Sequence, residues 1–175
     1  MRVTLIAVQS LDGFITRHGT PGAGFASEAD QRYFRAALRG FDCSVMGRAT
    51  YAQLRAEGGG QPDASRRRVV LTRTPEKFAA GTVPGAVEFT AEPPAGVVAR
   101  LRAAGHRACA LLGGAQIHSL FLAAGLVDEL WLTVEPRLFG GGTPLLTAPA
   151  DARLELLAHL PLDSGTLLLK YAVRR

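Results

Sequence analysis

The sequence predicts an α/β fold, a three-layer αβα sandwich with a mixed, mostly parallel central sheet and a C-terminal antiparallel hairpin. Strand-like apolar runs alternate with helical patterns over most of the 175 residues, which is typical of a parallel sheet with helices on its faces. Near the C-terminus, two strand-like segments, 154–160 and 166–173, are joined through the turn residues 163–165, which indicates a hairpin. The composition, 47% hydrophobic and 20% charged, suits one globular domain over residues 1–175.

The first half of the chain carries three strand patterns and a capped helix. Residues 2–8 are apolar at almost every position, as in a strand covered on both faces. Ser27 is a suitable N-cap for a helix that runs to about Arg39. Two further strands are expected at 42–46 and 69–71, and the first of them leads directly into a short helix.

The second half predicts a weak strand at 87–90, a helix at 94–104, and then a strand–helix–strand unit on which the fold is centred. The strands of that unit are expected at 108–112 and 127–134, with Gly113 and Gly114 between the first strand and the helix. The expected apolar face of the helix comprises Ile117, Leu120, Phe121 and Ala124.

The glycine pair suggests a ligand that carries phosphate. Two glycines between a strand and a helix let phosphate oxygens approach bare N–H groups, and the helix dipole favours their charge. The alternative is that Gly113 and Gly114 only permit a tight turn. Two other strands are followed by similar chemistry, Gly47-Arg48 with Thr50 and Thr72-Arg73, at the positions where open α/β sheets bind ligands. This recurrence favours the ligand-binding hypothesis.

Asp30 is the candidate acid of the sequence. It lies three and four residues before Tyr33 and Phe34, which belong to the apolar stripe of its helix, so it is expected on the inward-leaning face. A carboxylate that faces a cleft has a raised pKa and can protonate, or hydrogen-bond to, a nitrogen heterocycle. The spacing from Ser27 to Asp30 also resembles a capping box, in which the carboxylate would reach back to the helix start.

Composition narrows the classes of partner and compartment. The net charge of +5 is concentrated in the first two-thirds of the chain, but the basic stretches lack interleaved aromatic residues and a DNA-binding motif. A small phosphorylated molecule is therefore expected rather than nucleic acid. Cys43 and Cys109 lie in apolar runs without metal-site spacing, as in buried thiols of a reducing compartment. No stretch predicts a membrane span, so a cytoplasmic protein is expected.

Several short motifs, in their order and spacing, resemble one family over nearly the whole chain. These are Thr4–Val8 with Leu11-Asp12-Gly13, Ala29-Asp30 with Tyr33-Phe34, Val45–Arg48 with Thr50-Tyr51, Val70–Arg73, Leu112–Ala115 through Phe121-Leu122, and Gly125–Leu130 followed by Pro136 and Phe139–Gly142. The chain resembles the dihydrofolate-reductase-like superfamily, in particular the reductase domain of bacterial riboflavin biosynthesis and its stand-alone relatives. The resemblance implies an NADPH-dependent oxidoreductase, as a homodimer.

The resemblance also implies residues that hold NADPH. Val8 and Ile15 would flank the nicotinamide, and Leu71, Thr72 and Arg73 would bind the adenine ribose with its 2′-phosphate. The remaining cofactor residues lie around the glycine motifs: Gly47, Arg48, Thr50, Leu112, Gly113, Gly114, Ala115, Gln116 and Ile117.

For the substrate, the resemblance implies Asp30 and Thr133 as the catalytic pair, with Asp12, Asp30 and Phe34 in contact with the ligand. Two positions depart from the riboflavin branch, since Phe14 stands where a lysine is common and Leu112 where an acidic residue is common. Alternatives are therefore a dihydrofolate reductase, a reductase of another small heterocycle, and a non-catalytic module that binds NADPH. The zinc-binding residues of the companion deaminase are absent, so no metal is expected.

Overall fold

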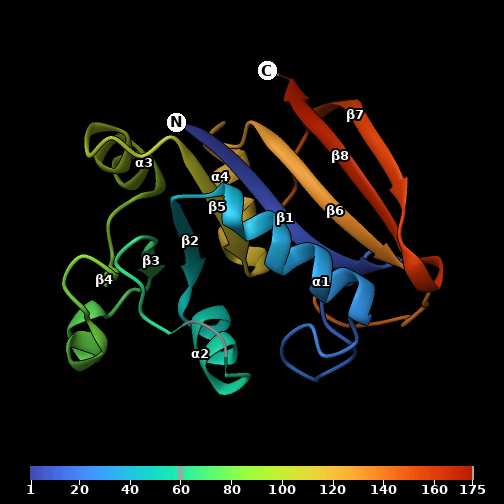
Figure 1. The fold of residues 1–175 in the computed structure, drawn as a ribbon, viewed down its shortest axis with the longest axis horizontal. Coiled ribbons are helices and arrows are strands. Elements are labelled where there is room, and N and C mark those ends of the chain that lie inside the picture. Colours follow the sequence, from blue (N-terminus) through green and yellow to red (C-terminus); the bar gives the residue numbers. More distant parts are fainter. Residues whose placement is uncertain (59–60, 175) are drawn as a thin grey trace.

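A computed structural model, which describes residues 1–58 and 61–174, shows one eight-stranded mixed sheet with helices on both faces (Figure 1). The strands are β1 (Arg2–Ser10), β2 (Cys43–Gly47), β3 (Arg67–Leu71), β4 (Val87–Thr90), β5 (Ala108–Gly113), β6 (Glu129–Glu135), β7 (Arg153–Pro161) and β8 (Leu167–Arg174). The α-helices are α1 (Glu28–Ala37), α2 (Arg48–Ala56), α3 (Pro94–Ala103) and α4 (Ala115–Ala123), and short 3₁₀ segments occur at Leu38–Gly40, Pro75–Gly81 and Asp163–Gly165.

The strand order is β4-β3-β2-β5-β1-β6-β8-β7. The first six strands in this order are mutually parallel, whereas β8 is antiparallel to β6 and β7 is antiparallel to β8. The carboxyl ends of the six parallel strands therefore meet at one edge of the sheet, which is where α/β proteins bind ligands. Among the helices of the described residues, none is long and apolar enough to cross a bilayer.

The core lies on both faces of the sheet. On one face, side chains of α3 and α4, including Val98 and Phe121, pack against alternate residues of the central strands such as Leu5 and Leu111. On the other face, Phe34 of α1 packs against Ile6, and residues of α2 pack against Met46 and Val70 of the neighbouring strands. Figure 1 shows α1 in front of β1 while α4 lies behind β5. The predicted three-layer sandwich with its C-terminal hairpin is confirmed.

One local prediction is wrong, namely the inward face of α4. Leu120 is 51% exposed and Ala124 is exposed, whereas the polar residues His118 and Ser119 are buried. The physical reason is that the segment after β6 supplies polar partners to this face. Ser119 Oγ accepts hydrogen bonds from the N–H groups of Thr147 (2.9 Å) and Ala148 (3.3 Å), and His118 Nδ1 lies 3.1 Å from the carbonyl oxygen of Leu145. The spacing of apolar residues does not reveal polar side chains that are buried because they form such hydrogen bonds.

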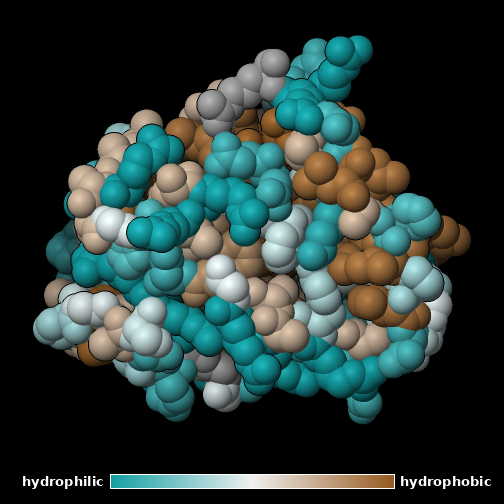
Figure 2. Space-filling view, turned by 45° about the horizontal axis from the view of Figure 1, so that its top comes forward, coloured by the Kyte–Doolittle hydropathy of each residue, from teal (hydrophilic) through white to brown (hydrophobic). Residues whose placement is uncertain are grey.

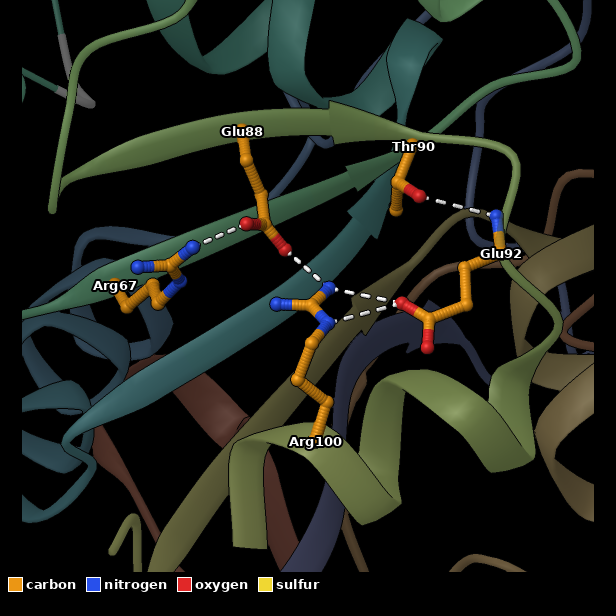
Figure 3. A network of polar contacts seen from close by, with 5 residues as sticks. All are labelled: Arg67, Glu88, Thr90, Glu92 and Arg100. Atoms are coloured by element: carbon orange, nitrogen blue, oxygen red, sulfur yellow. Dashed lines mark hydrogen bonds and ion pairs between the residues drawn. The ribbon is translucent and has the colours of Figure 1, made fainter. Parts of the chain in front are cut away.

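The edge strand β4 is held by a network of ion pairs (Figure 3). Glu88, with a 19% exposed side chain, pairs with Arg67 of β3 and, at 2.5 Å, with Arg100 of α3. Arg100 also donates to Glu92 at 2.9 and 3.1 Å. One carboxylate thus joins β3, β4 and α3. Burial acts to raise the pKa of Glu88, but hydrogen bonds from Arg100 and Arg67 outweigh it and hold the pKa below its usual range.

Glu88→Gln is expected to lower the free energy of unfolding by about 1 kcal/mol near neutral pH, which is about 2–4 °C in Tm. Because the pKa of Glu88 is lowered by folding, its stabilising contribution is present above the unfolded value of about 4.3 and disappears as pH falls through the folded value. Thermal unfolding at neutral and acidic pH checks both points. Glu76→Gln, at an exposed position without an ion pair among the described residues, is the matched control. An equal loss in both variants, or a difference that grows on acidification, would contradict this account.

Candidate active site

Two glycines bring the ends of β2 and β5 together at the ligand-binding edge. Gly47 ends β2, Gly113 ends the neighbouring β5, and Met46 pairs with Gly113 in the sheet register. A Cβ atom on Gly47 would lie only 3.1 Å from Cγ1 of Ile117, in the first turn of α4. The start of α4 can approach β2 this closely only because position 47 has no side chain.

The N-termini of α2 and α4 adjoin each other at this edge. Their N-caps are Gly47 and Gly114, so neither helix has a side-chain cap, and neither has an acidic residue in its first turn. A Cβ atom on Gly114 would meet Oγ1 of Thr50, in the first turn of α2, at 3.5 Å. Gly113 has φ +87°, and the Gly113–Gly114 peptide bond is cis. Uncapped N–H groups and two positive helix ends form a natural cradle for an anion.

Arginines flank this cradle. Arg48 follows β2 and Arg73 follows β3; both are exposed, and neither forms an ion pair with any residue in 1–58 or 61–174. The Arg48 guanidinium carbon lies 5.7 Å from the ring centroid of Phe78, which stacks on Phe89 at 5.4 Å. Next to Arg73 in the sequence, Oγ1 of Thr72 accepts a hydrogen bond from the N–H of Thr74 at 3.4 Å. The cationic groups are therefore available to a ligand that runs along the ends of β2 and β3.

The remaining cofactor positions frame the same edge. Leu71 is buried at the end of β3, Leu112 is half-buried near the end of β5, and Ala115 and Gln116 open α4, with Ala115 buried and Gln116 exposed. Ile15 belongs to the loop after β1, where its N–H donates to the carbonyl oxygen of Thr143 at 2.8 Å. The structure thus brings these positions together, and their contact with a cofactor stays a prediction.

Asp30 and Thr133 form a buried pair beside the sheet. Asp30 of α1 is 7% exposed, and its carboxylate accepts a short hydrogen bond from the Thr133 hydroxyl of β6. The Thr133 hydroxyl also lies 3.4 Å from the carbonyl oxygen of Ala7. Ser27 Oγ caps the helix by accepting from the N–H of Asp30 at 3.2 Å, but the N–H of Ser27 donates to Glu135. The Asp30 side chain therefore does not complete a capping box; it faces β6.

The environment of Asp30 favours its protonated form. Burial raises the pKa of Asp30; the hydrogen bond from Thr133 opposes that rise, and the negative charge of Glu135 adds to it. One turn along α1, burial and the charge of Asp30 raise the pKa of Tyr33. The Tyr33 hydroxyl is buried and has no hydrogen-bond partner among the described residues. The site therefore contains a carboxyl group able to hold a proton in a poorly hydrated environment.

Val8 and Phe34 lie on the same side of the sheet as this pair. Val8 is opposite Thr133 in the β1–β6 register, so the two side chains share the face that α1 covers. Phe34 lies one turn after Asp30 and packs, half-buried, against Ile6 and Phe41. Both positions are close in the fold to the predicted catalytic pair, and their ligand contacts stay predictions.

Asp12 has a contact set that the sequence did not suggest. Its carboxylate accepts hydrogen bonds from the N–H groups of Gly140 (2.7 Å) and Phe139 (3.1 Å) and from the Ser10 hydroxyl (2.5 Å). The hydrogen bonds from Ser10 and Gly140 lower the pKa of Asp12; burial opposes them, and the bond from Phe139 adds to the lowering. Asp12 thus connects the loop after β1 to the loop after β6. Its contact with substrate stays a prediction.

Sequence reasoning missed Glu135 as a member of the site. This residue at the end of β6 is 2% exposed; Oε1 accepts from the N–H of Ser27 at 2.9 Å, and Oε2 accepts from the Thr166 hydroxyl at 3.0 Å. A usable signal was present in the sequence, because Trp131, Thr133 and Glu135 alternate along a strand and so share one face. A carboxylate on the face that carries Trp131 and Thr133 is a buried polar group that needs an explanation.

His118 is a buried side chain with a structural role. It is buried beneath Gly113, where burial lowers its pKa to about 4 despite the hydrogen bond to the carbonyl oxygen of Leu145. The imidazole is therefore neutral at physiological pH.

A separate cluster of Asp42, Cys43 and His106 lies at the opposite edge of the sheet, where β2 and β5 begin. Their ligating atoms lie within 4.8 Å of one another, a spacing that could hold a metal ion. Asp42 already accepts from the N–H of Arg107 (2.8 Å) and lies 3.4 Å from Nδ1 of His106. The Cys43 thiol is buried beside Ala108. The hydrogen bonds of Asp42 thus explain the cluster structurally, because they fix the start of β5. That the protein binds no metal stays a prediction.

Comparison with solved structures shows that several proteins share this fold. A protein of Shewanella sp. PV-4, described as a putative riboflavin biosynthesis protein, aligns over 100% of both chains with 24% identity and a TM-score of 0.77. RibD of Acinetobacter baumannii aligns over 99% of this chain and 58% of its own, with 18% identity and a TM-score of 0.79. Dihydrofolate reductase of Enterococcus faecalis, complexed with NADP(H), aligns over 99% of this chain and 97% of its own, with 20% identity and a TM-score of 0.70.

No curated protein sequence matches the chain. The family model of the RibD C-terminal domain, however, matches residues 1–168, nearly the full length of the sequence. This match confirms the resemblance drawn from the short motifs. The likeness to the solved structures is one of fold. The chain belongs to the RibD C-terminal domain family.

Proposed function

We propose that residues 1–175 act as one reductase domain, an NADPH-dependent oxidoreductase that reduces a ribosylamino-pyrimidine of riboflavin biosynthesis. The observation that carries the proposal is the juxtaposition, at one sheet edge, of two uncapped helix N-termini with the buried Asp30–Thr133 pair. Family membership supports it. A structural neighbour from Thermotoga maritima, of which this chain covers 56%, is described as a deaminase and 5-amino-6-(5-phosphoribosylamino)uracil reductase.

The residues at the strand ends fit a dinucleotide phosphate cofactor. The glycines at positions 47, 113 and 114 leave bare backbone at the two helix N-termini, where the pyrophosphate would bind. Arg48 and Arg73 would pair with the phosphate groups of the adenosine end, which explains a choice of NADPH over NADH. Val8 and Ile15 would flank the nicotinamide. When bound, NADPH supplies the hydride.

Asp30 and Thr133 would act on the substrate. The Asp30 carboxyl, with its raised pKa, can hydrogen-bond to a ring or imine nitrogen and supply the proton that balances hydride addition to the adjacent carbon. The Thr133 hydroxyl donates to Asp30 and so fixes which carboxyl oxygen faces the ligand. Phe34 would support the ring from α1. These groups position the acceptor and hold its proton, while poor hydration around them keeps that proton from exchanging freely with water.

The direct test is NADPH consumption by the purified protein with the ribosylamino-pyrimidine and, in parallel, with dihydrofolate, each repeated with NADH. Turnover of the ribosylamine with NADPH is the expected result. Turnover of neither compound while NADPH still binds would contradict the substrate and leave the cofactor site standing.

A dihydrofolate reductase is the second candidate. The buried carboxyl–hydroxyl pair is compatible with it, because a carboxyl that can hold a proton can hydrogen-bond to the ring nitrogen of a pterin as it can to that of a pyrimidine. The fold neighbour from E. faecalis is described with NADP(H) bound. Turnover of dihydrofolate alone in the parallel assay would select this candidate. A module that binds NADPH and turns over neither compound would be the third outcome.

Arg73→Gln is expected to raise the KM for NADPH by about 10- to 100-fold and to leave the KM for NADH nearly unchanged, because a charge-assisted phosphate contact is lost. Steady-state rates with both cofactors measure this ratio. Arg39→Gln, another exposed arginine, at the far end of α1, provides the control. An equal loss with both cofactors would show that Arg73 does not contact the 2′-phosphate.

We also propose that the protein is a cytoplasmic homodimer. Five leucines of the β7–β8 hairpin are 37–51% exposed and define a leucine patch: Leu154, Leu156, Leu157, Leu160 and Leu167. Figure 2 shows hydrophobic surface gathered on the side of the molecule where Figure 1 places this hairpin. β7 is also an edge strand of the sheet. An apolar edge of this kind marks an interaction surface.

Leu156→Lys combined with Leu160→Lys is expected to convert the dimer to a monomer, since two buried charges at an apolar interface oppose association. Light scattering after size exclusion measures the mass. Leu120→Lys, at an exposed leucine of α4 outside the patch, is the control. A monomeric wild-type protein would contradict the proposal.

A further inference from the structure

Two carboxylates are buried close together in the candidate active site. Asp30 is 7% exposed and Glu135 is 2% exposed, and neither forms an ion pair with a residue of the described segments 1–58 and 61–174. Like charges that are buried without a cation destabilise a protein, so their presence signals a use for the pair. The proposed function gives Asp30 a role as proton donor but gives Glu135 no role.

Glu135 holds the helix end that carries Asp30. Its Oε1 accepts from the N–H of Ser27, the N-cap of α1, and its Oε2 accepts from the hydroxyl of Thr166 at the start of β8. The hydroxyls of Ser27 and Thr166 lie 3.1 Å apart, and Ser27 Oγ in turn accepts from the N–H of Asp30. A continuous set of hydrogen bonds therefore leads from Glu135 to the backbone of Asp30. It fixes the distance between α1 and β6 that the Asp30–Thr133 bond needs.

The charges around Asp30 come from three elements. On its own helix lies Tyr33, whose hydroxyl is neutral at physiological pH. From β6, Glu135 presents a negative charge that opposes ionisation of Asp30. From β8, the Lys170 ammonium lies 3.7 Å from the ring centroid of Trp131 and 5.8 Å from that of Tyr33, and it forms no ion pair with Asp30. Glu135 therefore supplies the charge that acts on Asp30.

We propose that Glu135 is a positioning residue for Asp30, which it holds against Thr133 through the N-terminus of α1 and whose protonated form it favours by its negative charge. The role rests on the proposed function in so far as Asp30 is the proton donor. Its two parts are separable, because the hydrogen bonds fix geometry and the charge fixes proton occupancy. Both parts act on Asp30 without contact between Glu135 and the substrate.

Glu135→Gln tests the charge. The amide oxygen can still accept from Ser27 and the amide nitrogen can donate to Thr166, while the negative charge is removed. The titration midpoint of Asp30, followed by NMR of isotope-labelled aspartate carboxyl groups and assigned with Asp30→Asn, is expected to fall by about one pH unit. The alkaline limb of the kcat profile is expected to move with it, so that the rate one pH unit above the wild-type midpoint falls about tenfold. Glu129→Gln, which removes the same charge at the other end of β6, is expected to leave both unchanged.

Thr166→Val tests whether the hydrogen bonds of Glu135 position Asp30, because it removes one hydrogen bond to Glu135 and leaves the negative charge of Glu135 in place. We expect kcat to be about tenfold lower, the affinity for NADPH to be unchanged and the titration midpoint of Asp30 not to fall. This variant also keeps the proposal testable if Glu135→Gln does not fold. A wild-type kcat in Thr166→Val overturns the positioning part.

An Asp30 midpoint that is the same in wild type and Glu135→Gln overturns the electrostatic part. The NMR measurement does not depend on turnover. The Asp30 midpoint can fall as expected while the protein reduces neither test compound, or while the pH profile of kcat does not follow the midpoint. Either result supports the action of Glu135 on Asp30 and contradicts the proposed function instead.

Discussion

Asp30→Asn is expected to lower kcat by about 10²- to 10³-fold while the affinity for NADPH stays within a factor of two or so of the wild type, because general acid catalysis is typically of that magnitude. The asparagine can still accept the Thr133 hydrogen bond, but it has no proton to give. Steady-state rates measure kcat. Quenching of the fluorescence of Trp131, the one tryptophan of the sequence, measures cofactor binding.

The pH dependence sharpens this prediction. Burial raises the pKa of Asp30, so the protonated, active form persists to higher pH than for an ordinary aspartate and is lost as pH rises through the folded value. Wild-type kcat should therefore fall on the alkaline side, and the residual rate of Asp30→Asn should not. The variant should also unfold at an equal or higher temperature at neutral pH, since it removes a buried charge.

Asp163→Asn is the matched control for this substitution, since Asp163 is exposed and pairs with Arg32 at 2.7 Å. It should keep wild-type kcat. Loss of NADPH binding in Asp30→Asn would mean that the carboxyl supports the fold of the cofactor site rather than the reaction.

The sequence was sufficient for the strand–glycine–helix units because their signals are local. Apolar runs before Gly47 and Gly113 predict strands that end at those residues, and the absence of side chains there is visible without coordinates. The two strand ends lie side by side because β2 and β5 are parallel neighbours in the sheet. From the sequence we expected only that both ends lie at the same edge of the sheet. The direction of Asp30 could not be decided from its spacing, since a capping box and an inward carboxylate use the same positions. The structure decides it through Ser27, whose N–H donates to Glu135.

Contacts between distant segments were beyond the sequence. The Thr166–Glu135 bond joins the hairpin to β6, and Ser119 is buried because a segment 28 residues away bonds to it. The carboxylate of Glu88 likewise pairs with arginines of two other elements. In each case a polar residue is buried by partners that only the folded chain supplies, so periodicity and propensity carry no trace of the contact.

Gly113→Ala is expected to lower the free energy of unfolding by about 2–5 kcal/mol, or Tm by about 5–15 °C, and to weaken NADPH binding at temperatures where the variant remains folded. Two costs combine. At φ +87° an L-residue is strained, and the added Cβ would lie 2.5 Å from Nε2 of His118. His118 cannot retreat freely, because it is buried and bonded to the carbonyl oxygen of Leu145. Thermal unfolding and cofactor titration measure the two effects.

Gly105→Ala separates strain from collision. Gly105 has φ +90°, almost the same backbone conformation, but an added Cβ there meets no atom within 4 Å. That variant should lose only the conformational term, about 1–2 kcal/mol, and should keep full NADPH affinity. If the two alanines destabilise equally, the packing of His118 beneath Gly113 contributes nothing, and the glycine at the end of β5 is needed only for its backbone conformation. A larger loss at Gly113, accompanied by weaker NADPH binding, would mean that His118 supports the turn from below while the cofactor approaches it from the helix N-termini.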